Sequence, residues 1–343
     1  METYYIGFDI HKKTISFCMK KSNGDIIQEG KIIASRPALQ QWAEAIPVPW
    51  IGAMEATIFT GWIYEFLKPY GKEIKVAHPK MLKAISAAKK KNDSIDARMI
   101  CDLLRCNLLP ECYMVSAETR ELRRTLRYRN HIVREAVRMQ NKISGLLMEC
   151  GAQYSKRRLH GKKYFNELIE NLEDIPDSVK TLLSYSRAGY EMFTKAQKQL
   201  IRALRNHAAL KERVARLMTI PGIGEISALT WALEIDDPHR FKSIGKAVSY
   251  CGLCSAENSS AGKEKRGPIS KQRNKHLQTI LIEAAKLAPH WNIKLAEVYA
   301  QEKEKGSCNQ ATIAVARKLV AYMLAVDKSK QPFQMEAQEK IAA

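Results

Sequence analysis

Four carboxylates stand where a folded chain could bring them together. They are Asp9, Glu55, Asp93 and Asp96. Asp9 and Glu55 each close an apolar run typical of a buried strand, and Asp93 and Asp96 are three residues apart, a spacing that shares one helical face. Converging carboxylates repel one another unless divalent cations neutralise them, and oxygen ligands favour Mg²⁺ or Mn²⁺. Two such ions about 3.5–4 Å apart are common in phosphodiester chemistry. The residue types therefore predict a metal-dependent site for phosphodiester chemistry.

The first hundred residues contain the elements that would hold these carboxylates. Expected strands cover residues 4–10, 13–20, 25–34, 50–55 and 74–77, and expected helices cover residues 36–45, 61–67, 93–104 and a segment beginning near residue 79. Three successive strands followed by alternating helices and strands indicate a mixed α/β sheet with crossover connections. A single Asp at a strand end is more often a turn residue, and two Asp on a basic helix are more often solvated. The spacing alone therefore leaves the metal site open.

A long helix is expected from Ala117 to about Cys150, because no Gly or Pro occurs before Gly145. Arginines recur along it at three-to-four-residue spacing, namely Arg120, Arg124, Arg127, Arg134 and Arg138. Acidic residues in the same segment are too few to pair with all of them, so the stripe favours nucleic-acid contact over the solvated face of a coiled-coil arm. Residues 151–185 show no clear pattern, and a second helix is expected to return antiparallel over residues 187–217.

A glycine-rich turn opens the last third of the chain. Gly222 and Gly224 precede an expected helix at residues 226–234, which resembles a helix-hairpin-helix element whose backbone N–H groups hold a phosphate. A tight helix–helix turn that needs glycine for positive φ is the plainer explanation. The two explanations are compatible.

A polar loop rich in Ser and Gly follows at residues 257–271, before an expected helix at residues 275–287. Its cations, Lys263, Lys265, Arg266 and Lys271, are predicted to contact phosphates. A serine nucleophile such as Ser260 would need activation, and cations nearby would stabilise charge on a phosphate oxygen. Taken alone, the loop fits a flexible phosphate-contacting linker equally well.

Composition agrees with a polyanionic partner. The chain of 343 residues carries 56 Lys and Arg against 36 Asp and Glu, a formal net charge of +20. Its 45% hydrophobic content is that of a globular protein rather than a disordered basic tail. The eight scattered cysteines are expected to be free thiols, and neither a membrane span nor a secretion signal is recognisable. A cytoplasmic protein is expected.

Several motifs together resemble the DEDD transposases of insertion sequences, the family numbered one-ten with its eleven-eleven-like subgroup. They are the first strand ending in Asp9, Met54-Glu55-Ala56-Thr57, Lys91-Asn92-Asp93-Ser94-Ile95-Asp96-Ala97, Ile220-Pro221-Gly222-Ile223-Gly224, Tyr250-Cys251-Gly252-Leu253, and the serine loop with Gly267-Pro268-Ile269-Ser270-Lys271. The resemblance covers residues 4–326.

The resemblance implies an α/β plus α architecture in three parts. These are a RuvC-like RNase H fold at residues 1–112, a helical coiled-coil arm at residues 113–217, and a mostly helical transposase domain with the helix-hairpin-helix-like element at residues 218–343. It implies that Asp9, Glu55, Asp93 and Asp96 bind Mg²⁺ or Mn²⁺ and that Ser260 is the nucleophile. Ala261 stands where the family usually has Gly, which leaves Ser259 as an alternative.

The activity implied by the resemblance is RNA-guided, site-specific DNA recombination and transposition through a phosphoserine intermediate. The implied partners are donor and target double-stranded DNA, a structured non-coding guide RNA (the bridge RNA), and further copies of the chain in a homodimer or homotetramer. The implied location is the bacterial cytoplasm, at the nucleoid. The alternative is a RuvC-like, metal-dependent, structure-selective endonuclease that acts by hydrolysis. A non-catalytic nucleic-acid-binding protein is the third possibility.

Overall fold

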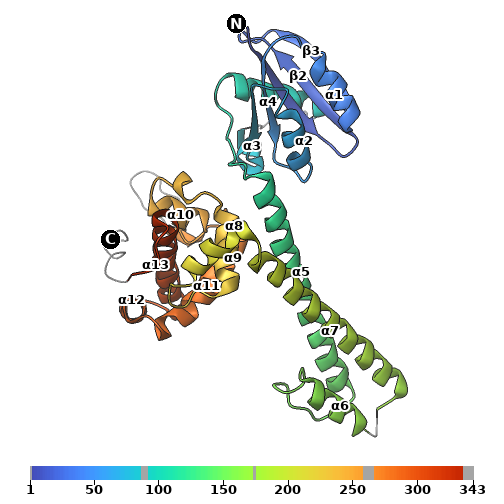
Figure 1. Cartoon of the computed structure of the whole chain (residues 1–343), viewed down its shortest axis with the longest axis vertical. Helices are drawn as coiled ribbons and strands as arrows, with labels where there is room; N and C mark the ends of the chain where they lie inside the picture. Colours follow the sequence, from blue (N-terminus) through green and yellow to red (C-terminus); the bar gives the residue numbers. More distant parts are fainter. Residues whose placement is uncertain (1, 86–91, 173–174, 258–265, 335–343) are drawn as a thin grey trace. The chain divides into compact units, whose positions relative to one another are not determined.

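The computed structural model describes residues 2–85, 92–172, 175–257 and 266–334. The chain forms two compact units, Met1–Ala117 and Glu118–Ala343. Figure 1 shows a sheet in the first unit and helices throughout most of the second. The mixed α/β class with a C-terminal helical region is therefore confirmed.

The first unit is built on one five-stranded sheet. Its strands are β1 (Tyr4–Ile10), β2 (Thr14–Lys20), β3 (Ile26–Ile33), β4 (Trp50–Glu55) and β5 (Glu73–Ala77). They lie in the order β3-β2-β1-β4-β5, with the first three antiparallel and both β1–β4 and β4–β5 parallel. Helix α1 (Arg36–Glu44) connects β3 to β4, and α2 (Thr60–Leu67) connects β4 to β5. Helices α3 (Pro79–Ile85) and α4 (Asp93–Arg105) follow. The predicted strands are confirmed with ends that differ by one residue at most.

Opposite faces of the sheet bury different helices. Phe8 and Met54 pack with Leu39 of α1 and Ile63 of α2, whereas Ala53 packs with Ile100 of α4. Because side chains alternate along a strand, each strand contributes to both layers. Whether Asp9 and Glu55 face α1 and α2 or face α4 therefore depends on their position in this alternation.

Gly7 allows α4 to lie directly on β1. A Cβ at this position would come within 2.2 Å of the Ala97 carbonyl oxygen and 2.4 Å of the Cys101 backbone nitrogen. The Cys101 thiol also donates a hydrogen bond to the Tyr5 carbonyl, with 3.1 Å between the heavy atoms. Since Tyr5 lies beside Cys101 and Gly7 beside Ala97, the helix runs opposite to the strand. The start of α4 therefore lies at the carboxyl end of β1.

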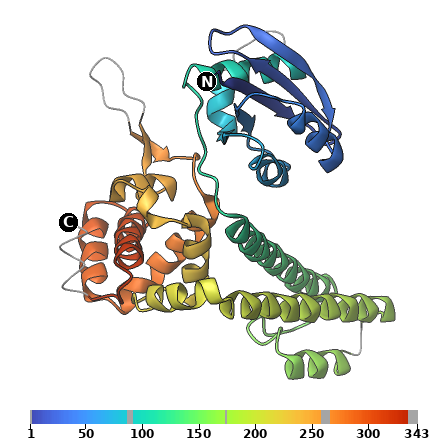
Figure 2. The same cartoon turned by 45° about the horizontal axis from the view of Figure 1, so that its top comes forward.

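The second unit begins with a helical hairpin, formed by α5 (Ala117–Glu149) and α7 (Asp177–Arg205) and joined through α6 (Lys162–Glu170). The two long helices lie side by side and antiparallel, because Arg129 donates to Gln197 and Met139 contacts Gly189 (Figure 2). A small core containing Phe165 closes the end of the hairpin.

The predicted start of the second long helix, at residue 187, is wrong. Helix α7 begins at Asp177, so residues 151–185 contain α6 and the first turns of α7. The helix predicted to continue to residue 217 also breaks at Asn206 and His207, after which α8 (Ala208–Leu217) begins. The mixed charge of this segment hides the helical period, whereas tertiary packing of Phe165 and Leu183 stabilises it.

The elements that follow α8 are α9 (Glu225–Ile235), η1 (Pro238–Arg240), α10 (Ile244–Tyr250), β6 (Ser255–Glu257), β7 (Arg266–Ile269), α11 (Lys275–Leu287), η2 (Ala288–His290), α12 (Ile293–Lys305) and α13 (Cys308–Ser329). Helices α10, α11 and α12 pack against the C-terminal helix α13. One side of the core is fixed by a buried ion pair in which Arg213 donates two hydrogen bonds to Asp327, at 2.8 and 2.6 Å. Among the helices that the structure describes, none combines the length and apolar character needed to cross a membrane.

Candidate active site

Two of the predicted site residues lie at the carboxyl ends of neighbouring parallel strands. Phe8 and Met54 are the last residues that pair between β1 and β4, and Asp9 and Glu55 follow them. Since Phe8 and Met54 both face the core beneath α1 and α2, the next residue on each strand faces the opposite side, toward α4. Asp9 and Glu55 are thus neighbours on the same face.

The other two lie in the first turn of α4. The Asn92 side chain caps this helix by accepting a hydrogen bond from the Ile95 backbone N–H at 2.8 Å, which places Asp93 and Asp96 in the first turn. A helix N-terminus favours negative charge. Because α4 lies directly on β1 at Gly7, this turn adjoins Asp9.

The charges of this cluster are only partly balanced. Burial raises the pKa of Asp9, and the negative charges of Asp96 and Asp93 raise it further, against the opposing effect of His11. By contrast, a hydrogen bond from the Lys31 ammonium lowers the pKa of Asp93, with 3.1 Å between the Lys31 Nζ and an Asp93 oxygen. The cluster therefore retains excess negative charge that an added cation would neutralise.

His11 lies between two of the carboxylates. Its Nε2 is 3.1 Å from an Asp9 oxygen and 3.3 Å from an Asp93 oxygen. One ligand atom from each of these three residues lies within 4.8 Å of the others, close enough to hold one metal ion. Sequence reasoning missed His11, although a histidine two residues after a strand-end Asp lies on the same side of an extended chain.

The structure thus brings together part of the predicted tetrad. Asp9 and Asp93 share the three-residue group with His11, and the charge of Asp96 acts on Asp9. Glu55 is placed beside Asp9 by strand register, and its backbone carbonyl accepts a hydrogen bond from the Thr60 hydroxyl at 3.0 Å. Two carboxylates with further oxygen donors nearby fit a hard divalent cation.

The predicted nucleophile lies outside the described residues. Ser260, its alternative Ser259, and the predicted phosphate contacts Lys263 and Lys265 all belong to residues 258–265. The strands on either side, β6 and β7, pair antiparallel, with Ser255 opposite Ile269. The ends of the predicted serine loop are therefore held as a hairpin. Lys271, just beyond β7, is exposed.

The arginines of the predicted stripe on α5 differ in exposure and in their partners. Arg124 and Arg134 are exposed, and Arg138 pairs within the helix with Glu135 at 2.9 Å. Arg127, by contrast, donates two hydrogen bonds of 2.8 Å each to the carboxylate of Glu234 in α9. Sequence reasoning considered only acidic partners within the segment, so it missed this pairing.

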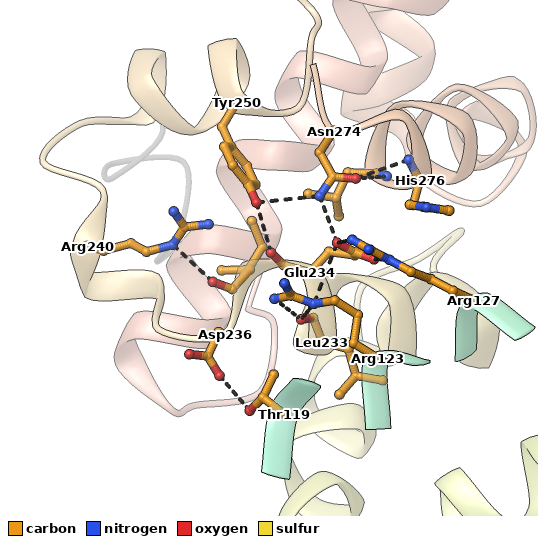
Figure 3. A network of polar contacts seen from close by, with 12 residues as sticks. Thr119, Arg123, Arg127, Leu233, Glu234, Asp236, Arg240, Tyr250, Asn274 and His276 are labelled. Carbon is orange, nitrogen blue, oxygen red and sulfur yellow. Dashed lines mark hydrogen bonds and ion pairs between the residues drawn. The ribbon is translucent and has the colours of Figure 1, made fainter. Parts of the chain in front are cut away.

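Glu234 is the centre of a buried polar network (Figure 3). Its side chain is only 1% exposed, and it also accepts a hydrogen bond from the Asn274 amide at 2.8 Å. Arg123, also on α5, donates two hydrogen bonds to the carbonyl of the neighbouring residue, Leu233. Burial alone would raise the pKa of Glu234, but the hydrogen bond and charge of Arg127 outweigh it and leave this pKa below its usual value. Glu234 is therefore a charged structural group.

The network extends to the helix that follows the serine hairpin. The Asn274 side chain caps α11 by accepting from the His276 and Leu277 backbone N–H groups, and its own backbone N–H donates to the Tyr250 carbonyl at 3.0 Å. Arg240 stacks over the ring of Tyr250. Glu234 and Asn274 thus connect α5, α9 and α11 at one point.

The glycine-rich turn has a structural explanation. Gly222 has φ of +88°, and a Cβ there would lie 2.5 Å from the Ala288 Cβ, so both backbone conformation and packing require glycine. Gly224 precedes α9 without a side-chain cap, and open space surrounds the position of its missing Cβ. Contact of this turn with a phosphate stays a prediction.

Two family profiles match the chain in order. A profile of DEDD transposases of the IS110 type, described as "Transposase", matches residues 6–151. A second, described as "Transposase IS116/IS110/IS902 family", matches residues 214–300. Together they span more than half of the chain, and the first includes all four predicted carboxylates.

Relatives match over similar lengths. The transposase for insertion sequence element IS1328 of Yersinia enterocolitica is 26% identical over 321 residues, 92% of this chain and 93% of that protein. The transposase for insertion sequence element IS1111A of Coxiella burnetii is 25% identical over 324 residues, 91% and 86% of the two chains. The pilin gene-inverting protein of Moraxella bovis is 26% identical over 188 residues, 54% and 58% of the two chains.

DEDD transposases are enzymes that generally use divalent metal ions, and the carboxylate cluster fits that requirement. Taken with the two profiles in their order along the chain, these observations identify the protein as a DNA transposase of the IS110 family.

Proposed function

We propose that this transposase is an RNA-guided, site-specific DNA recombinase of an insertion sequence, which exchanges strands through a phosphoserine intermediate. The observation that carries the proposal is the convergence of Asp9 and Asp93 at the end of β1, with ligand atoms within 4.8 Å of each other and of His11. The relative from Moraxella bovis, whose name describes gene inversion, supports recombination as the outcome.

Asp9, Glu55, Asp93 and Asp96 hold Mg²⁺ in this proposal, although Mn²⁺ satisfies the same ligands. The cation, when bound, neutralises the carboxylates and polarises the scissile phosphate. The carboxylates orient that phosphate, and Lys31 keeps Asp93 ionised, as its lowered pKa indicates.

Ser260 is the proposed nucleophile, because it occupies the family's serine position in the sequence between β6 and β7. Its Oγ bonds to phosphorus as the bond from phosphorus to the 3′ oxygen breaks, and the serine proton passes to the departing oxygen. One DNA end is then esterified to the protein and the other carries a free 3′-hydroxyl. Attack by the 3′-hydroxyl of another strand releases Ser260 and joins the recombinant without an external energy source.

The strand order β3-β2-β1-β4-β5, with three antiparallel strands followed by two parallel ones, supports a RuvC-like RNase H fold for the first unit. The antiparallel α5 and α7 support the helical coiled-coil arm, and the remaining helices form the proposed transposase domain. Exposed cations that include Arg124, Arg134 and Lys271 are proposed to hold DNA and guide RNA. Assembly as a homodimer or homotetramer on the bacterial nucleoid is part of the same proposal.

The test is to trap the protein on DNA labelled next to the cleavage site. Wild type is expected to acquire the label covalently when Mg²⁺ is present. Ser260→Ala is expected to lose the adduct, whereas the neighbouring Ser259→Ala variant serves as the matched control and is expected to retain it.

Two outcomes would change the proposal. An adduct that persists in Ser260→Ala and disappears in Ser259→Ala would reassign the nucleophile. Cleavage by Ser260→Ala that leaves free 5′-phosphate ends would instead establish the hydrolytic endonuclease alternative. RNA guidance is tested separately by sequencing the RNA that co-purifies with the protein, and its absence would contradict that part of the proposal.

A further inference from the structure

A basic pocket lies at the base of the helical hairpin, and none of its lining residues was predicted as a site residue from the sequence. It has a volume of about 560 Å³ and is formed by α5, α7 and the start of α9. Its lining consists of Arg129, Gln197, Lys198, Ile201, Arg202, Arg205 and Ile226. Four of these seven residues are cationic and none is acidic, so the pocket presents a concentrated positive charge.

Two of the cations project from successive turns of α7. Lys198 and Arg202 are four residues apart and exposed, and neither forms an ion pair with any residue in the described ranges. Like charges at this spacing repel each other and destabilise a helix. An anion bound between them would remove that repulsion.

Arg129 adds a guanidinium whose hydrogen-bonding capacity is not fully used. Its two terminal nitrogens donate to Asn130 and Gln197, at 3.1 and 3.0 Å. Its buried Nε–H, however, has no acceptor in the part of the chain that the structure describes. A buried polar group without a partner costs free energy. Burial also lowers the pKa of Arg129, as expected for a desolvated cation that lacks a carboxylate.

One lining residue, Arg205, already binds an anion, the carboxylate of Glu225. Arg205 is paired with the Glu225 carboxylate through two hydrogen bonds, and Glu225 is the first residue of α9. A carboxylate at a helix N-terminus, held by an arginine, has the same recognition pattern as a phosphate at that place. The charge of Arg205 is therefore balanced by Glu225, whereas no carboxylate in the described ranges balances Arg129, Lys198 or Arg202, which can bind an added ligand.

We propose that this pocket binds the phosphodiester backbone of a nucleic-acid strand, with Arg129, Lys198 and Arg202 as its phosphate contacts. This inference rests on the proposed function, because it assigns to the transposase a backbone-binding site made of residues other than the four carboxylates and the predicted arginine stripe. Ile201 and Ile226 give the pocket an apolar wall against which a sugar or base can pack. DNA and guide RNA share the backbone chemistry, and the experiment distinguishes them.

The test is lysine footprinting on the unmodified full-length protein without divalent cations, so that no strand is cut. Lys198 and Lys195 are both exposed on α7, but only Lys198 lines the pocket, which makes Lys195 the internal control. Acylation of each lysine is measured alone, with mixed-sequence single-stranded RNA, and with a DNA duplex of equal length. Protection of Lys198 by several-fold, with Lys195 unchanged, is expected for at least one of the two nucleic acids, and the protecting one identifies the strand.

Equal reactivity of Lys198 with and without both nucleic acids would overturn the proposal, as would equal protection of Lys195. A second measurement uses the Lys198→Gln/Arg202→Gln protein against Lys195→Gln. The double variant is expected to reduce the slope of log K against log salt by about 0.9 per lost duplex contact, or about 0.7 per single-strand contact. An unchanged slope would also overturn the proposal. Neither measurement involves Ser260 or strand cleavage, so their failure is distinct from failure of the proposed recombination.

Discussion

Two carboxylate sites in this protein, Glu234 and the cluster around Asp9, have opposite surroundings. Glu234 is buried, and its charge is satisfied by Arg127 and Asn274, which belong to different helices. Asp9 lies near two further carboxylates, Asp93 and Asp96, and its pKa is raised. The negative charge of Glu234 is therefore balanced by groups of the protein, whereas the negative charge around Asp9 is balanced only in part.

This contrast distinguishes Glu234, which stabilises the fold, from Asp9, which we propose binds a metal ion. A carboxylate whose hydrogen bonds are all satisfied internally stabilises the fold and has no remaining capacity for a ligand. A carboxylate whose pKa is raised by burial and by neighbouring carboxylates, as for Asp9, has the surroundings typical of a functional site and retains capacity for a cation. The predictions below test this contrast, beginning with the largest expected effect.

Asp9→Asn is expected to reduce strand cleavage by at least about 10³-fold, because metal ions contribute several kcal/mol of charge stabilisation in the transition state. The same change removes a repelled carboxylate, so the variant is expected to be at least as stable as wild type toward urea. Cleavage of labelled DNA and urea unfolding measure the two effects. A variant that retains cleavage would show that Asp9 is not a metal ligand.

Glu234→Gln is expected to behave in the opposite way, losing about 2–3 kcal/mol of stability. Breaking a fully buried ion pair costs about 3–5 kcal/mol, and the 46% exposure of the Arg127 side chain reduces that cost. Urea unfolding measures the loss, and Glu212→Gln, at a side chain that is 88% exposed, is the control. If both variants lost the same stability, the network would have no special role.

The two acids are also expected to give opposite pH dependence of stability in metal-free buffer. Glu234 has a lowered pKa in the folded state, so its contribution is present above the unfolded value of about 4.3 and is lost as the pH falls through the folded value. Asp9 has a raised pKa, so its ionisation opposes folding once the pH rises above the unfolded value of about 3.9.

Comparing each variant with wild type from neutral pH down to about pH 3, below the unfolded values of both carboxyls, tests these signs. The stability deficit of Glu234→Gln is expected to shrink with acidification, and any advantage of Asp9→Asn is expected to shrink likewise. A deficit of Glu234→Gln that grew on acidification would contradict the assigned direction.

Local signals explain why the sheet could be predicted from the sequence. Apolar alternation defines β1 and β2, and Asn92 in front of Asp93 is a helix-capping signal. The same elements allowed Asp9 and Asp93 to converge, but the spacing alone left the metal site open. The close approach at Gly7, which fixes that convergence, depends on three-dimensional packing and could not be predicted from the sequence.

The parts that sequence reasoning missed depend on distant partners. Arg127 and Glu234 are 107 residues apart, so no local pattern joins them, although a Glu near the end of the largely apolar helix α9 was a visible signal. His11 was missed because its role appears only when α4 is placed beside β1. The assignment of Ser260 stays a prediction from the family resemblance.

Titration of the metal-free protein with Mn²⁺, followed by electron paramagnetic resonance, tests the central claim most directly. Wild type and Glu234→Gln are expected to bind Mn²⁺ alike, whereas Asp9→Asn and Asp93→Asn are expected to bind it at least about tenfold more weakly, a loss of about 1.4 kcal/mol or more. Equal Mn²⁺ affinity in wild type and both Asp variants would contradict the assignment of this cluster as the metal site.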